Sequence, residues 1–205
     1  MSSQKCTFCE EQNNLTREHI PPKNLFFKPK PNNLITVPSC RTCNLGFQKD
    51  EEYFRIAISG ICGDSVKFQG LLLQNVNKQL AHQPKLATTI QGNLQQVEIK
   101  TKILYGWRSD DPRIGRIFQK IIRGLHFHER RTLLPQNQGM SWNIIDEDFI
   151  EKMGPVQFLI GAPVHDIGNG IFQYKVRFSK TGNSLWLLKF YDTVEFFAIT
   201  LSSGF

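Results

Sequence analysis

The chain of 205 residues is long enough for one small module and one domain of about 100–150 residues, and 40% hydrophobic residues can bury a core. Its 25 lysines and arginines exceed its 18 aspartates and glutamates, and the net charge of +7 favours an anionic partner such as nucleic acid. No apolar stretch reaches the ~20 residues of a membrane-spanning helix and the N-terminus lacks a signal-peptide core, so we expect no membrane partner and a cytoplasmic protein.

Four of the five cysteines form two C-x2-C pairs, Cys6 with Cys9 and Cys40 with Cys43. Two such pairs supply the four thiolates of a closed tetrahedral zinc site, and their wide separation suits an iron–sulfur cluster less well. Disulfides or simply buried cysteines are the alternative, but two matches to this pattern rarely arise by chance. We predict that these four residues bind a structural zinc ion, which favours a reducing compartment, and that Cys62 is an apolar core residue.

The segment that joins the two cysteine pairs is predicted to contain two strands. Residues 15–20 form the first, which ends before Pro21-Pro22 because proline cannot continue a β-ladder. Residues 34–37 form the second, which is expected to end before Pro38. From 41 to 59 the apolar residues do not alternate, so a helix is predicted there. The expected order is strand, strand, helix, with zinc fixing both ends of the intervening loop.

Residues 6–54, about a quarter of the chain, resemble an HNH endonuclease domain, which has the ββα-metal fold, in the variant held by two zinc knuckles. Three features carry this resemblance: the two cysteine pairs, the asparagine directly after the last cysteine, and the segment Thr16-Arg17-Glu18-His19-Ile20-Pro21-Pro22.

The resemblance implies a role for each polar residue of this motif. His19 would be the general base, and Glu18 and Asn44 would bind a catalytic Mg²⁺ or Mn²⁺ ion. A middle asparagine would brace the loop and orient the base. Asn33 is preferred for that role, and Asn32 is the alternative that the sequence does not separate from it.

Elementary chemistry agrees with these roles. Histidine has an ordinary pKa of about 6.5, so much of it is free base at neutral pH and can take a proton from water. A carboxylate and an amide oxygen suit Mg²⁺ or Mn²⁺, which would stabilise the leaving oxygen. Neighbours in a regular strand face opposite ways, so Glu18 and His19 can share one phosphate only if the strand distorts near Pro21-Pro22.

Each of these residues also has a structural interpretation. His19 could hydrogen-bond a backbone carbonyl at the end of a strand. Glu18 could be a solvated surface charge. Asn44 could be the N-cap of a helix, a position that asparagine favours.

Nine basic and three acidic residues lie between Lys100 and Arg131. The centre of this stretch is predicted to be an amphipathic helix over 112–128, which begins at Pro112, a favoured first-turn residue. At about 100° per residue, one face is apolar and the other carries a row of bases. This row is either a track for nucleic-acid phosphates or an ordinary solvated helix face, and it consists of Arg113, Arg116, Lys120 and Arg123.

Beyond these elements we expect a helix over 71–86 and a strand over 97–103. Four strands are expected to form an antiparallel meander at the C-terminus, over 156–161, 171–178, 184–190 and 194–201. Its core would be supplied by Trp186, Phe190, Phe196 and Phe197. The predicted fold class is α+β. Residues 1–59 would be the ββα-metal zinc module, and residues 60–205 an α+β domain with a helical middle and a C-terminal antiparallel sheet.

Two classes of function fit these observations. The first is a metal-dependent endonuclease, with DNA as the expected substrate and, from the resemblance, 5′-phosphate and 3′-hydroxyl products. Cutting both strands with one site per chain would favour a homodimer. The second is a non-catalytic zinc-ribbon protein that grips nucleic acid with its basic helix. In the first class, residues 60–205 could also bind nucleic acid, sense a ligand or mediate dimerisation.

Overall fold

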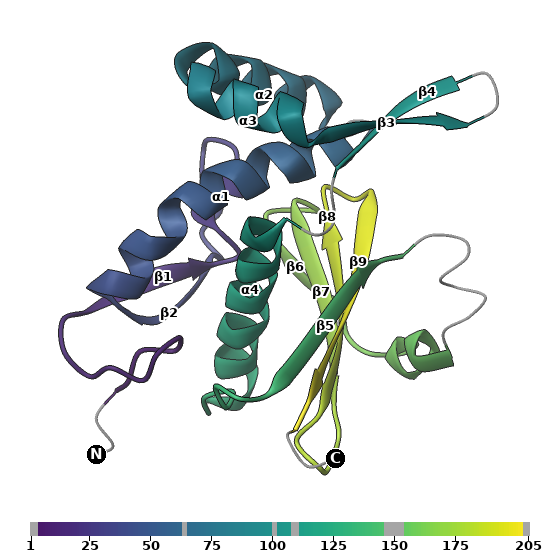
Figure 1. Ribbon diagram of the computed structural model, residues 1–205. Helices are drawn as coiled ribbons and strands as arrows, with labels where there is room; N and C mark the ends of the chain where they lie inside the picture. The colour runs from purple at the N-terminus through teal and green to yellow at the C-terminus, as the bar shows by residue number, and fades with distance from the viewer. Residues whose placement is uncertain (1–3, 63–64, 100–101, 108–110, 146–153, 203–205) are drawn as a thin grey trace.

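The computed structural model describes residues 4–62, 65–99, 102–107, 111–145 and 154–202, which form an α+β fold (Figure 1). Near the N-terminus, β1 (Leu15–Ile20) pairs antiparallel with β2 (Ile35–Cys40), and α1 (Arg41–Ile61) follows directly. A short 3-10 helix, η1 (Lys23–Leu25), lies in the loop between the strands. The predicted order of strand, strand, helix is therefore confirmed.

The second strand does not end before Pro38, as expected, but continues to Cys40. Pro38 stands opposite Arg17, and its carbonyl accepts a hydrogen bond from the backbone N–H of Thr7, 2.9 Å away. The nitrogen and carbonyl of one strand residue face the same side, so the missing N–H of Pro38 faces away from β1. In a two-stranded sheet a proline on the outer side costs no ladder bond.

The single helix predicted over 71–86 is two helices, α2 (Gln69–His82) and α3 (Pro84–Asn93). Pro84 begins α3 because proline suits the first turn of a helix and cannot continue one, and Gln83 between the helices is non-helical with φ −133°. Within the described residues, no helix is both long enough and apolar enough to cross a bilayer.

The strand expected over 97–103 is likewise two strands, β3 (Leu94–Ile99) and β4 (Lys102–Trp107). They pair antiparallel, from Leu94 opposite Trp107 to Ile99 opposite Lys102, and the pair extends away from the rest of the protein (Figure 1). An alternating pattern indicates a strand but does not show where the chain reverses.

The C-terminal sheet is antiparallel and has the order β5-β9-β8-β7-β6. Its strands are β5 (Gly139–Ile144), β6 (His165–Ile167), β7 (Phe172–Phe178), β8 (Ser184–Phe190) and β9 (Val194–Leu201). The meander of the last three strands is confirmed. Residues 168–170 connect β6 to β7, and all three have positive φ, which the two glycines adopt without strain.

The strand expected over 156–161 is wrong, because residues 154–159 form a 3-10 helix, η2 (Gly154–Leu159). Leu159 is buried, whereas Phe158 and Ile160 are 70% and 74% exposed. A short apolar run does not distinguish a strand from a helical turn by periodicity alone. The edge strand β5 was not predicted, although Met140, Trp142 and Ile144 alternate along it.

One core joins the N-terminal hairpin to the C-terminal sheet through α4 (Pro112–Arg130), which begins at the predicted residue. Phe118 of α4 stacks on Trp142 of β5 at 4.3 Å between ring centres and meets Phe54 of α1 edge-on at 5.5 Å. Phe190 and Phe196 of the sheet complete the cluster. In Figure 1, α4 lies between the hairpin with α1 on one side and the sheet on the other. The division at residue 59 stays a prediction, but both parts share this core.

Gly124 of α4 packs directly against Ile20 of β1. A Cβ atom built there would lie 2.3 Å from Cγ1 and 3.1 Å from Cγ2 of the fully buried Ile20, and a β-branched side chain has little freedom to rotate away. We expect Gly124→Ala to destabilise the protein by about 1–3 kcal/mol through overpacking. Gly115→Ala, in the same helix but with only Trp142 at 4.0 Å, should instead stabilise it by about 0.5–1 kcal/mol. Urea unfolding of both variants measures this difference, and equal effects would contradict it.

Candidate functional site

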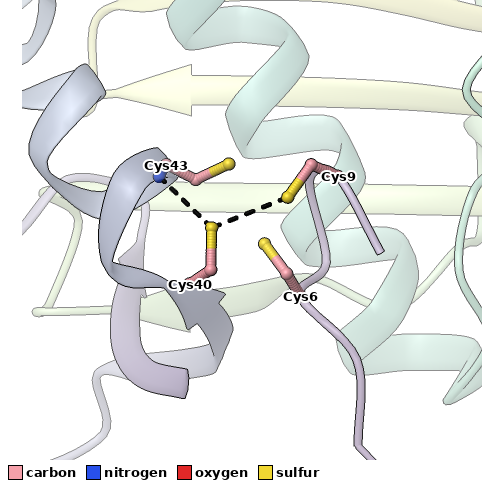
Figure 2. A group of neighbouring side chains, drawn as sticks. All are labelled: Cys6, Cys9, Cys40 and Cys43. Carbon is pink, nitrogen blue, oxygen red and sulfur yellow. Dashed lines mark hydrogen bonds between the residues drawn. The ribbon is translucent and has the colours of Figure 1, made fainter. Parts of the chain in front are cut away.

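The four predicted zinc ligands come together at the junction of β2 and α1. The sulfur atoms of Cys6, Cys9, Cys40 and Cys43 all lie within 4.8 Å of one another, and their side chains converge (Figure 2). The Cys9 and Cys40 sulfurs are 3.6 Å apart. A tetrahedral zinc ion with bonds of about 2.3 Å places its sulfur ligands about 3.8 Å apart, so this cluster is consistent with a structural zinc site. Cys62 lies elsewhere, fully buried in the core as expected.

Backbone N–H groups favour the thiolate state of two of these sulfurs. Phe8 donates to the Cys6 sulfur and Cys43 donates to the Cys40 sulfur, each over 3.4 Å. Cys40 is also the N-cap of α1, where the helix dipole favours negative charge. Burial raises the pKa of Cys6, but backbone hydrogen bonds lower it by more, so the pKa is about 7. Burial and its neighbouring thiols raise the pKa of Cys43, so a bound cation is needed to ionise all four.

His19 and Glu18 lie on opposite faces of β1. The strand is not distorted near Pro21-Pro22, because residues 15–20 pair one-to-one with residues 40–35, so the condition for Glu18 and His19 to share one phosphate is not met. Glu18 stands opposite buried Val37 and is itself only 6% exposed, whereas His19 stands opposite exposed Thr36 and is half-buried. Burial, and then the positive charge of Lys23, lower the pKa of His19 below its ordinary value.

Glu18 belongs to a buried ionic cluster between β1, α1 and α4. Lys120 has a fully buried side chain whose Nζ donates to Glu18 Oε1 at 3.0 Å and also to Glu51 Oε1. The same Glu18 oxygen accepts a 2.9 Å hydrogen bond from the backbone N–H of His19. Burial raises the pKa of Glu51, and the charge of Lys120 opposes that rise. A buried charge that loses its partner is strongly destabilising, so this cluster fixes α4 against the strand that carries His19.

Asn44 lies in the first turn of α1 and is bonded to the strand that carries His19. Its Nδ2 donates to Thr16 Oγ1 at 3.0 Å and to the Arg17 carbonyl at 3.4 Å. The N-cap of α1 is Cys40, so the N-cap role considered for Asn44 is wrong. Because the amide nitrogen donates to β1, the amide oxygen is the atom that remains to bind a cation.

Asn33 braces the loop that follows His19 against β6 of the C-terminal sheet. Its Nδ2 donates to the Asp166 carbonyl of β6, 2.9 Å away, which ties this loop to the C-terminal sheet. Both Asn33 and the alternative Asn32 are exposed. The bond to β6 favours Asn33 as the bracing residue, while its action on His19 stays a prediction.

The basic row of α4 is not an exposed stripe. Lys120 is fully buried, so the predicted exposure is wrong there, because the acidic side chains of β1 and α1 cover this part of the helix. The ion pairs are Arg113 with Asp111, Arg116 with Asp50 and Lys120 with Glu18. Arg123 donates to the carbonyls of residues 134–136. Lys100 and Arg108 of the wider basic stretch lie outside the described residues. Nucleic-acid binding by α4 stays a prediction that these contacts do not favour.

Comparison with protein-family models, with curated proteins and with solved structures found no match to this chain. The site must therefore be interpreted from its own geometry. Among the described histidine, cysteine, aspartate and glutamate residues, the four cysteines are the one group of three or more that could hold a metal ion. Sequence reasoning overlooked Lys23 and Lys30, whose charges act on His19, although both follow it within the same loop.

Proposed function

We propose that this protein is a metal-dependent endonuclease of the HNH type that hydrolyses phosphodiester bonds, with DNA as the expected substrate. The observation that carries the proposal is the hydrogen bond from Asn44, in the first turn of α1 next to the four-cysteine cluster, to Thr16 of β1, the strand on which His19 lies. In this arrangement one strand carries a histidine and the following helix carries an amide, and the cysteine cluster lies at the start of that helix. This resembles the part of a ββα-metal site that holds the general base and a metal ligand.

In this proposal His19 takes a proton from the water that attacks the phosphorus atom. The Asn44 amide oxygen is one ligand for Mg²⁺ or Mn²⁺, which when bound supplies positive charge at the leaving oxygen. Glu18 lies on the face of β1 opposite His19, and its Oε1 is engaged with Lys120 and the His19 backbone, so these contacts do not favour its predicted role as a second ligand of this cation. The products are a 5′-phosphate and a 3′-hydroxyl, and a homodimer would cut both strands.

The second candidate is a zinc-ribbon protein that binds nucleic acid without cleaving it. The buried ion pair of Glu18 with Lys120 favours this alternative, because a carboxylate that already neutralises a lysine is a weaker cation ligand.

Supercoiled plasmid incubated with the purified protein tests the proposal. We expect nicking that requires Mg²⁺ or Mn²⁺, stops with EDTA and resumes when Mg²⁺ but not Zn²⁺ is added back, while the zinc content measured after EDTA stays unchanged. Cleavage that persists without a free divalent cation would contradict the one-metal mechanism. Plasmid binding without cleavage under both metals would favour the zinc-ribbon alternative.

A further inference from the structure

A groove of about 710 Å³ opens between the loop after η1, α1 and α2. We call it the basic groove. Two lysines of the loop, one arginine of α1 and one lysine of α2 line it, together with one histidine and one acid; they are Lys28, Lys30, Arg55, Lys78, His82 and Glu52. Cations from three separate elements thus face one concave surface.

In the part of the chain that the structure describes, the four cations of the basic groove form no ion pair, whereas three of the four bases in the α4 row do. Among the described residues, no carboxylate oxygen lies within 4.0 Å of Lys28, Lys30, Arg55 or Lys78. Lys28 and Lys78 are exposed, so their charges are available to a ligand. Three of the four bases in the α4 row are thus neutralised by acids, whereas in the groove the charge of Glu52 acts on Arg55 without forming an ion pair.

Lys30 shows that these cations act on one another. Its side chain is half-buried, and its Nζ donates to the Lys23 carbonyl at 3.1 Å. Burial lowers the pKa of Lys30, and the charges of Lys23, Arg55 and Lys28 lower it further. An anion bound among these groups would relieve their mutual repulsion and replace the water that they lose.

The loop that follows the strand of His19 contributes to the basic groove. It carries Lys28 and Lys30, and the charge of Lys30 acts on the imidazole of His19. A nucleic acid carries the regularly spaced phosphates that cations from three elements can contact together.

We propose that the basic groove binds the sugar–phosphate backbone of nucleic acid. The inference rests on the proposed function for its choice of ligand, but binding is measurable without cleavage. Phosphate contacts of this kind position the substrate and do not read its sequence.

The test uses the full chain with His19→Ala as background, so that no probe is cut. Lys28→Gln with Lys78→Gln removes two exposed groove charges. The matched control is Arg177→Gln with Lys180→Gln, which removes two exposed charges at the β7–β8 end of the sheet. Binding of fluorescent duplex DNA is followed by anisotropy across a series of salt concentrations.

We expect the groove variant to raise the Kd roughly tenfold at low salt and to flatten the plot of log K against log salt by about 1.8, since each duplex phosphate contact contributes about 0.9. The control should change neither. Equal losses in both variants would overturn the inference, and so would groove-dependent binding to vesicles of anionic lipid without binding to DNA.

Cleavage separates this inference from the proposed function. If the wild type cuts DNA through His19 but the groove variant binds as tightly as the control, the groove inference fails and the nuclease stands. If binding depends on the groove but no condition gives cleavage, the groove inference stands and the nuclease fails.

Discussion

Replacement of His19 by alanine is expected to abolish phosphodiester cleavage while the fold and the zinc content stay unchanged. The side chain is half-buried and faces away from the Glu18–Lys120 cluster, so its loss removes no buried partner. A general base contributes about 10²–10⁴-fold to a rate, and we expect a loss of that order. Initial rates of plasmid nicking in Mg²⁺ or Mn²⁺ measure it, beside circular dichroism and metal analysis of the same preparations.

Arg177→Gln is the control, because Arg177 is exposed and lies in β7 of the C-terminal sheet. It should retain wild-type nicking. Equal nicking by the wild type and His19→Ala would show that the base is assigned wrongly or that a contaminant cuts the plasmid. Glu18→Gln adds a second comparison: weaker dependence on Mg²⁺ would assign Glu18 to the cation, and lower thermal stability alone would assign it to positioning.

Replacement of Cys40 by serine is expected to release the zinc and to unfold the N-terminal hairpin. Cys40 joins the end of β2 to the start of α1, and its sulfur lies in the four-cysteine cluster. Structural zinc contributes apparent binding free energies of about 10–16 kcal/mol in zinc-finger peptides, far more than a short hairpin gains by burying apolar surface. Metal analysis and hydrogen exchange of residues 15–40 check both effects.

Cys62→Ala is the control for this variant. Cys62 is fully buried but belongs to the core rather than to the cluster, so its variant should lose some stability and keep stoichiometric zinc. Wild-type zinc content and hairpin protection in Cys40→Ser would contradict a four-cysteine site.

Local patterns in the sequence were sufficient for the N-terminal elements. The cysteine spacing predicted the cluster, and a strand before Pro21-Pro22 and a helix from Arg41 followed from the proline positions and the apolar period. These signals lie within a few residues of one another, so they can be recognised without knowledge of any distant contact. Pro84 was an equally local signal that should have divided the predicted helix.

Other features could not follow from local patterns. The apolar run over 156–161 fits a strand as well as a helical turn, and only its packing in the tertiary structure, where η2 contacts β7 and β8, decides between them. The faces of β1 depend on its regular register with β2, which assigns Glu18 to the core and His19 to the surface.

The sequence by itself determined the four-cysteine cluster, the position of His19 on a strand and the excess of positive charge. Only the tertiary structure decided which cations are free. Lys120 pairs with an acid 102 positions away and Arg116 with one 66 positions away, whereas the cations of the basic groove form no ion pair with any described acid. The sequence shows which residues carry charge, but whether a charge is neutralised depends on contacts between distant residues. These contacts form only when the helices and strands pack.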